Sequence, residues 1–237
     1  VLFRSVPLHA LSAQGPLRTL DEAEGKELLA GLGLPIPLGE VAAGAEVVAA
    51  AGRIGYPVVL KMMGPRLAHK SEAGAVAIGL AGPADLANAL EQMRADVAAR
   101  DPLAVTDRFL VEAMAPRPLA ELLVNLRRDA QFGLTLTLGA GGVLVELLQD
   151  AATLLFPVAR HDVLAALQSL KVWPLITGFR CKEAGDVDAL LDAVMAVAGY
   201  AQAHAAQLVE LDVNPVLVLP KGCGVLAVDA LIRLKTP

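Results

Sequence analysis

The chain has 237 residues, of which 55% are apolar and 19% are charged, and its formal net charge is −5. Such a length suffices for one large domain or two small lobes with a substantial core. The acidic balance and the 3% aromatic content argue against a nucleic-acid-binding surface. The longest uncharged stretches, 73–84 and 132–145, are shorter than the roughly 18 apolar residues of a membrane span, so we expect none.

The cysteines and the N-terminus indicate the cellular setting. Cys181 and Cys223 match no metal or redox spacing, and we expect reduced thiols in a cytoplasmic protein. The first residues, "VLFRSVPLHA", lack the apolar segment of a signal peptide and an initiator Met, so we expect a fragment. Residues 1–18 are expected to form an irregular extension.

Helical and extended patterns alternate over residues 19–108, the expected N-terminal lobe. A helix capped by Thr19 or Asp21 is expected to run to about residue 32. We then expect a strand near 36–41, a helix over 45–54, strands over 57–62 and 75–80, and a helix from Pro83 to about residue 99. This alternation is typical of an α+β or α/β fold.

A C-terminal lobe is expected over residues 109–237, after a polar linker at 100–108 that can act as a hinge. The segments "FLVEAM", "LAELLVNLR" and "FGLTLTLGAGG" are predicted strands, and the last two alternate with a leucine-rich core face. Helices at about 161–170 and 186–204 and strands at 208–219 and 225–231, around the turn "PKGCG", complete this lobe.

Lys61 ends the apolar strand "PVVL". A compact ammonium group at a strand end suits a phosphate oxygen. The alternative is a lysine that extends from an edge strand into water, and the residue alone favours this alternative.

The closing strands contain a possible metal site. Glu210, Asp212 and Asn214 share one face of "VELDVNPVLVL", and Pro215 predicts an edge or a bulge. A hairpin through "PKGCG" would bring Asp229 beside Asn214, and a carboxylate plus an amide oxygen suits Mg²⁺. A solvated polar face with one buried, hydrogen-bonded aspartate explains the same residues equally well.

Two glutamates and a glycine-rich segment complete the candidates. Glu112 lies near the expected hinge and Glu121 opens the next strand, where a carboxylate can accept hydrogen bonds from ribose hydroxyls. Alone, each is typical of a surface residue. The "GAGG" at 139–142 is not a dinucleotide fingerprint, and the sequence contains no phosphate-binding P-loop motif.

Taken in order, "EGKELLAGLGLPIP", "GYPVVLKMMGPRLAHKSEAGAV", "FLVEAM", "ELDVNPVLVL" and "VLAVDALIRL" resemble the ATP-grasp domain of NDP-forming acyl-CoA synthetases. This family includes ADP-forming acetate–CoA ligase and is related to the succinyl-CoA synthetase β subunit. The resemblance covers about residues 19–234 and implies an ATP-grasp fold whose two lobes clamp the nucleotide. By position, Lys61 would bind ATP phosphates, Glu112 would lie at the adenine hinge and Glu121 near the ribose, and Asn214 and Asp229 would hold Mg²⁺.

His69 matches the histidine of the family's His-Lys-Ser motif. The resemblance implies that it relays the phosphoryl group between ATP and a histidine of the CoA-binding domain, and neutral imidazole is a competent nucleophile. The alternative is a histidine that only hydrogen-bonds its own loop. The sequence departs from the family at Gln149, where a lysine is frequent, and at Cys181, where a small residue is frequent.

The resemblance implies an acid–CoA ligase that converts acid, CoA and ATP (or another NTP) into acyl-CoA, ADP and phosphate through phosphohistidine. A CoA-binding and ligase domain, or an α subunit, would be the partner that handles the acid and CoA. The alternative is a non-catalytic ATP-binding regulatory domain attached to an acetyltransferase, against which His69 and the metal pair argue. The His-Lys-Ser loop does not support a carboxylate–amine ligase.

Overall fold

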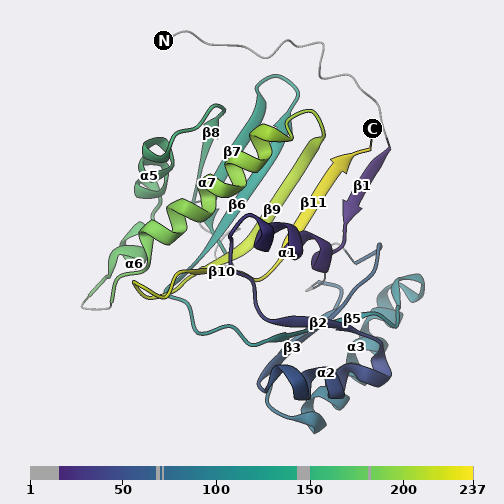
Figure 1. Cartoon of the computed structure of the whole chain (residues 1–237). Helices are drawn as coiled ribbons and strands as arrows, with labels where there is room; N and C mark the ends of the chain where they lie inside the picture. Colours follow the sequence, from purple (N-terminus) through teal and green to yellow (C-terminus); the bar gives the residue numbers. More distant parts are fainter. Residues whose placement is uncertain (1–15, 68–69, 71, 143–149, 181–182, 237) are drawn as a thin grey trace. The chain divides into compact units, whose positions relative to one another are not determined.

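The computed structural model describes residues 16–67, 70, 72–142, 150–180 and 183–236. These residues form two compact units (Figure 1). Of the described residues, the larger unit contains 16–20, 24–36 and those from Arg117 onward, and the smaller unit contains 21–23 and those between 37 and 116. Among the described helices, none combines the length and hydropathy needed to cross a membrane.

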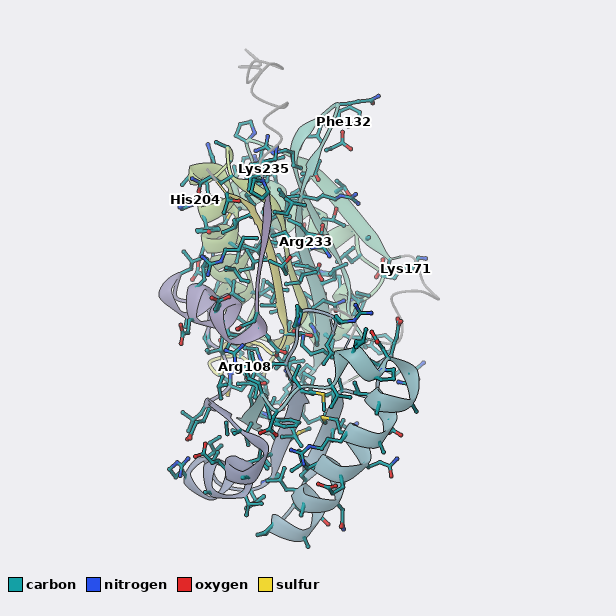
Figure 2. All side chains as sticks on the ribbon, turned by 90° about the vertical axis from the view of Figure 1, so that its right-hand side faces the viewer. Arg108, Phe132, Lys171, His204, Arg233 and Lys235 are labelled. Atoms are coloured by element: carbon teal, nitrogen blue, oxygen red, sulfur yellow. The ribbon has the colours of Figure 1, made fainter. Side chains whose placement is uncertain are left out.

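The larger unit is built on a sheet with seven strands in the described residues. Neighbouring strands run antiparallel. Their order is β1 (Leu17–Leu20), β11 (Ala230–Lys235), β9 (Leu208–Val218), β6 (Ala120–Asp129), β7 (Gly133–Ala140) and β8 (Ala151–Leu155), and β10 (Val225–Ala227) also pairs with β9. At the tip of the β6–β7 hairpin, Phe132 projects outward (Figure 2).

Helices cover one face of this sheet. They are α1 (Glu22–Gly31), α5 (Arg160–Ser169), α6 (Trp173–Thr177) and α7 (Val187–Ala203). Figure 1 shows α7 crossing the strands. Leu122, Val124 and Leu126 alternate onto the helical face and are buried, as the sequence predicts, while Glu121, Leu123 and Asn125 point to the opposite face.

The smaller unit has a four-stranded antiparallel sheet in the order β2 (Gly39–Ala42), β5 (Phe109–Ala113), β3 (Val58–Met62) and β4 (Val76–Leu80). Helices α2 (Val47–Ile54) and α3 (Pro83–Arg100) and the short 3-10 helices η2 (Gly44–Glu46) and η3 (Pro102–Ala104) accompany it. Leu60, Met62 and Val111 pack in its core. Because side chains alternate along a strand, Lys61 and Glu112 lie on the opposite face.

The units divide the chain differently from the expected lobes. Residues 109–116 belong to the smaller unit because β5 pairs with β2 on one side and β3 on the other. Residues 24–36 belong to the larger unit, where a Cβ on Gly25 would lie 3.3 Å from the Ala230 Cβ. The expected hinge at 100–108 lies inside the smaller unit, where Asp101 accepts a hydrogen bond from the Leu103 N–H and pairs with Arg66.

The N-terminal segment also differs from expectation. Leu17 and Arg18, expected to be irregular, pair with Lys235 and Leu234 in the sheet. Thr19 lies in the same strand, so it does not cap the following helix, which begins at Glu22. The sequence did not predict β8 or α6, because each is only five residues long and too short for a recognisable periodic pattern.

Candidate functional site

Lys61 is held by two carboxylates. Its Nζ lies 2.5 Å from Glu22 Oε1 and 2.9 Å from Glu112 Oε2. Glu112 is a diagonal neighbour across the β3–β5 ladder, within reach of a long side chain. Lys61 is 6% exposed and β3 lies between β5 and β4, so the alternative of an edge-strand lysine extending into water is wrong.

Lys70 is the fourth residue of this arrangement. The second carboxylate oxygen of Glu22, Oε2, lies 3.0 Å from the Nζ of Lys70. We call Glu22, Lys61, Lys70 and Glu112 the lysine–glutamate cluster, and their side chains are between 1% and 12% exposed. The sequence pattern does not single out Glu22, because an acidic residue in the first turn of a helix is ordinary by itself.

A glycine makes room for Glu112. Gly39 of β2 lies opposite Glu112 in the ladder, and a Cβ there would come within 2.9 Å of the Glu112 Cγ. The missing side chain therefore lets the Glu112 side chain lie over β2.

Glu121 is positioned by backbone in the larger unit. The Gly141 N–H donates a hydrogen bond to the Glu121 carbonyl oxygen at 2.6 Å. Gly142 has a φ of +70°, and a Cβ there would overlap the Glu121 carboxylate. Gly141 and Gly142 of the "GAGG" segment therefore allow the close backbone approach to Glu121.

The register of the closing strands aligns Asn214 and Asp229. Val213 pairs with Ala230 of β11, and Val216 pairs with Ala227 of β10. Between these pairs, the Val228 N–H donates to the Pro215 carbonyl at 3.2 Å. The continuous register sets Asp229 opposite Asn214, as the hairpin prediction requires. The ladder with β6 shifts at this point, which confirms the predicted bulge at Pro215, although β9 is an internal strand.

Carboxylates gather around this pair. Burial raises the pKa of Asp212, with further repulsion from Glu210 and Asp229, while a hydrogen bond from Asn125 Nδ2 at 2.8 Å opposes the rise. Among the described residues, no group of three His, Cys, Asp or Glu side chains forms a metal cage. An amide and a carboxylate beside like charge fit Mg²⁺, which keeps much of its shell for water and phosphate.

Other predicted positions lie outside the described residues. They are His69, Gln149 and Cys181. Asp150, which follows Gln149 in the sequence, is described and buried, and its two oxygens accept the N–H groups of Lys171 and Val172 at 2.8 and 2.9 Å. Asp150 therefore anchors the loop before α6.

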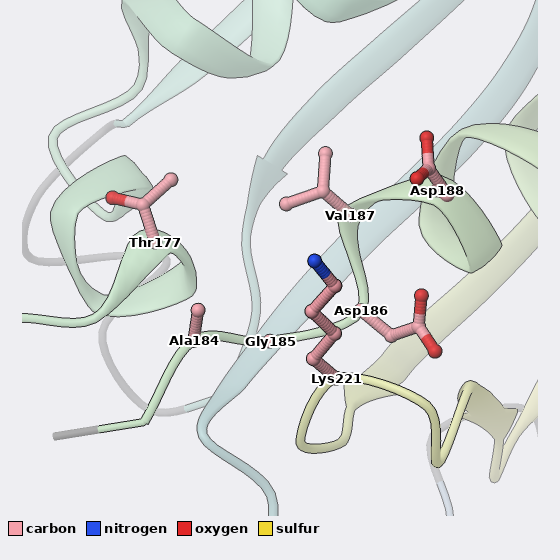
Figure 3. A pocket seen from close by; sticks show the side chains of 7 residues that line it. All are labelled: Thr177, Ala184, Gly185, Asp186, Val187, Asp188 and Lys221. Carbon is pink, nitrogen blue, oxygen red and sulfur yellow. The ribbon is translucent and has the colours of Figure 1, made fainter.

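A surface hollow of about 220 Å³ lies in the larger unit (Figure 3). Asp186 beside it caps α7 through the Ala189 N–H and holds the "PKGCG" turn through the N–H groups of Gly222 and Gly224. The predicted site residues are not among its lining. The lining residues are Thr177, Ala184, Gly185, Asp186, Val187, Asp188 and Lys221. We interpret the hollow as a structural junction.

Comparison with known proteins decides the family. The model of the ATP-grasp domain matches residues 10–234. The chain is an ATP-grasp domain. This confirms the α+β ATP-grasp fold expected from the sequence. Its relatives include the β subunit of acetate–CoA ligase (ADP-forming) II of Pyrococcus furiosus, 33% identical over 90% of this chain and 91% of the relative.

A longer relative and a solved enzyme extend the comparison. A trans-feruloyl-CoA synthase from an unknown prokaryotic organism is 37% identical over 90% of this chain, which spans 30% of that relative. Among solved structures, the dinucleotide-forming acetyl-coenzyme A synthetase 1 of Ca. Korarchaeum cryptofilum, with coenzyme A and Ca-AMPCP, has a TM-score of 0.84 at 35% identity, covering 92% and 94% of the two chains. The ATP-grasp domain described here therefore belongs to the ATP-grasp part of the ADP-forming acyl-CoA ligases.

Proposed function

We propose that this ATP-grasp domain binds Mg-ATP and passes its γ-phosphoryl group on within an ADP-forming acyl-CoA synthetase. The observation that carries the proposal is the register that sets Asn214 opposite Asp229. A magnesium nucleotide needs oxygen ligands of this kind. The membership of the chain in the ATP-grasp part of these ligases supports the same reaction.

The roles of the individual residues are assigned as follows. Lys61 stabilises negative charge on the phosphates. Asn214 and Asp229 would supply oxygen ligands to Mg²⁺, which when bound neutralises phosphate charge. Glu121 is assigned to the ribose. The assignment of Glu112 to the adenine hinge rests on the resemblance, because its carboxylate is engaged by Lys61.

His69 is the proposed relay. The γ-phosphorus–oxygen bond of ATP breaks, ADP leaves with that electron pair, and an imidazole nitrogen forms the new bond to phosphorus. A structure of the Ca. Korarchaeum enzyme with Mg-AMPPCP is described with its phosphohistidine segment pointing towards the nucleotide-binding site. This supports phosphohistidine chemistry in a relative that is 33% identical.

The whole reaction needs further domains. We infer that a CoA-binding and ligase domain, or an α subunit, binds the acid and CoA and accepts the phosphoryl group. The chain covers 91% of a separate β subunit, which fits an α-subunit partner. It covers 30% of a longer synthase, which fits a CoA-binding and ligase domain in the same chain. The cytoplasmic location stays a prediction.

Labelling with γ-labelled ATP and Mg²⁺ tests the proposal. The full chain with its partner should gain acid-labile, alkali-stable label, and His69→Asn should abolish the label while Mg-ATP affinity is kept. His161→Asn is the matched control, because this histidine has an 84% exposed side chain in the larger unit. If the wild-type complex turns over acyl-CoA and the His69→Asn complex does so at the same rate, the relay is excluded. Failure of the wild-type protein to bind Mg-ATP by calorimetry would exclude the function.

A further inference from the structure

The lysine–glutamate cluster contains two cations and two anions that are almost completely buried. Glu22 is 4% exposed, Glu112 2% and Lys61 6%. Burying charges costs desolvation free energy that their mutual attraction offsets only in part, so such clusters contribute little net stability. A role in positioning charged side chains for a ligand explains these buried charges better than a role in stability.

Glu22 is the centre of the cluster. One of its oxygens lies 2.5 Å from the Nζ of Lys61, and the other lies 3.0 Å from the Nζ of Lys70. A single carboxylate thus forms ion pairs with two ammonium groups, one from a strand end and one from the loop that follows it.

Lys70 is also held through its backbone. Its carbonyl accepts a hydrogen bond from the Ala75 N–H at 2.8 Å, at the point where the chain enters β4. Because Ala75 is buried, the backbone of Lys70 is anchored to the core while its side chain reaches Glu22. Both the backbone and the side chain of Lys70 are therefore held in position, and its ammonium group shares the Glu22 carboxylate with Lys61.

We propose that Lys70 is a second phosphate-binding cation beside Lys61 and that Glu22 is a positioning residue that holds both ammonium groups. This inference rests on the proposed function, since it takes the phosphates of Mg-ATP as the ligand of Lys61. A polyphosphate presents several anionic oxygens, so two lysines at a fixed separation bind it more selectively than one point charge.

The direction in which Glu22→Gln changes nucleotide affinity distinguishes a positioning role of Glu22 from simple charge neutralisation. If Glu22 only offset positive charge, Glu22→Gln would leave an extra positive charge and tighten the binding of anionic phosphates. If Glu22 positions the lysines, the same change weakens binding despite the favourable charge. We expect weaker binding.

Calorimetry on the full chain tests both roles with Mg-ATP, Mg-ADP and AMP as ligands. Lys70→Met should lower the affinity for Mg-ATP and for Mg-ADP on the order of tenfold to a hundredfold, as loss of a charge-assisted contact does. AMP affinity should change much less, and Lys70→Arg should restore part of the loss. Lys221→Met, which removes a lysine of the larger unit outside the site, should bind all three like the wild-type protein.

Three other results would overturn the inference or part of it, provided that urea unfolding shows that the variant is folded. Equal Mg-ATP affinity in Lys70→Met and wild type would overturn the inference while the proposed function stands. Equal losses for all three nucleotides would also overturn it, because they indicate a structural role. Tighter binding by Glu22→Gln would overturn the positioning role. If Glu22→Gln does not fold, Glu22→Asp serves instead: it keeps the charge but shortens the reach, and wild-type affinity in it would count against positioning.

Discussion

In the smaller unit, Glu22 and Glu112 each lie within 3 Å of the ammonium group of Lys61, and Lys70 supplies a second cation. In the larger unit, Asp212 instead lies near two more carboxylates, Glu210 and Asp229, and its pKa is raised. In the first group, each carboxylate lies beside an ammonium group. In the second group, Glu210 pairs with Arg233 at 3.3 Å, and an added cation would reduce the repulsion between Asp212 and its neighbouring carboxylates. The smaller unit is therefore organised around its own counter-ions, and the larger unit is suited to Mg²⁺.

The largest expected effect comes from unbalancing the cluster. Lys61→Met should lower the free energy of unfolding by about 3–5 kcal/mol, because the buried carboxylates of Glu22 and Glu112 then both lose the ammonium group of Lys61. Urea unfolding monitored by circular dichroism measures the loss. Nucleotide binding by Lys61 variants must therefore be compared only where the protein is folded.

A double variant tests the charge balance directly. Lys61→Met with Glu112→Leu removes one cation and one anion of the cluster and keeps the contact between Glu22 and Lys70. This variant should be more stable than Lys61→Met alone, although it lacks one more polar group. If the second change adds a further loss, charge balance does not explain the stability of the cluster.

The sequence predicts the larger part of this fold because its periodic patterns are long. The alternating leucines of β6 and β7 and the helical pattern of α7 are each strong enough to be recognised locally. The opposition of Asn214 and Asp229 was also predictable, since a short turn at "PKGCG" leaves few registers.

Long-range pairings explain what the sequence does not predict. Glu22 and Lys61 are 39 residues apart, and no local pattern marks their contact. β5 follows a polar segment that resembles a linker, yet its pairing with β2 and β3 places it in the smaller unit. Such pairings depend on tertiary structure, which overrides local composition.

The position of Glu121 depends on backbone, in contrast to that of Glu112, which is paired with a lysine. Gly142→Ala should lower stability by about 1–3 kcal/mol, because alanine is unfavourable at a φ of +70° and its Cβ would displace the Glu121 carboxylate. Gly133→Ala is the matched control, since it has a φ of +77° and no atom within 4 Å of its Cβ. Thermal unfolding of both variants isolates the Glu121 contribution, and equal losses would contradict a role for this contact.

Magnesium alone tests the carboxylates of the larger unit. At ten times its dissociation constant, Mg²⁺ without nucleotide should stabilise the protein by about 1.4 kcal/mol through linkage. That corresponds to roughly 3–5 °C in Tm for a chain of this size. Asp229→Asn should remove most of the shift, whereas Asp188→Asn, at an 88% exposed side chain, should keep it. A full shift in Asp229→Asn would remove Asp229 from the metal site.

The smallest effect concerns Asp186, a carboxylate satisfied by backbone rather than by cations. Hydrogen bonds from the Ala189, Gly224 and Gly222 N–H groups hold its pKa below the usual value of 3.8, with a smaller contribution from Lys221. A folded-state pKa below the unfolded one adds stability that is complete above pH 3.8 and is lost as the pH falls through the folded-state pKa. Asp186→Asn keeps a helix cap but resembles the protonated acid, so at pH 7 it should be less stable by about 0.3–1 kcal/mol. In urea unfolding from pH 7 to pH 3 the two proteins should converge at the acid end, and a gap that stays constant with pH would show that the charge of Asp186 contributes nothing.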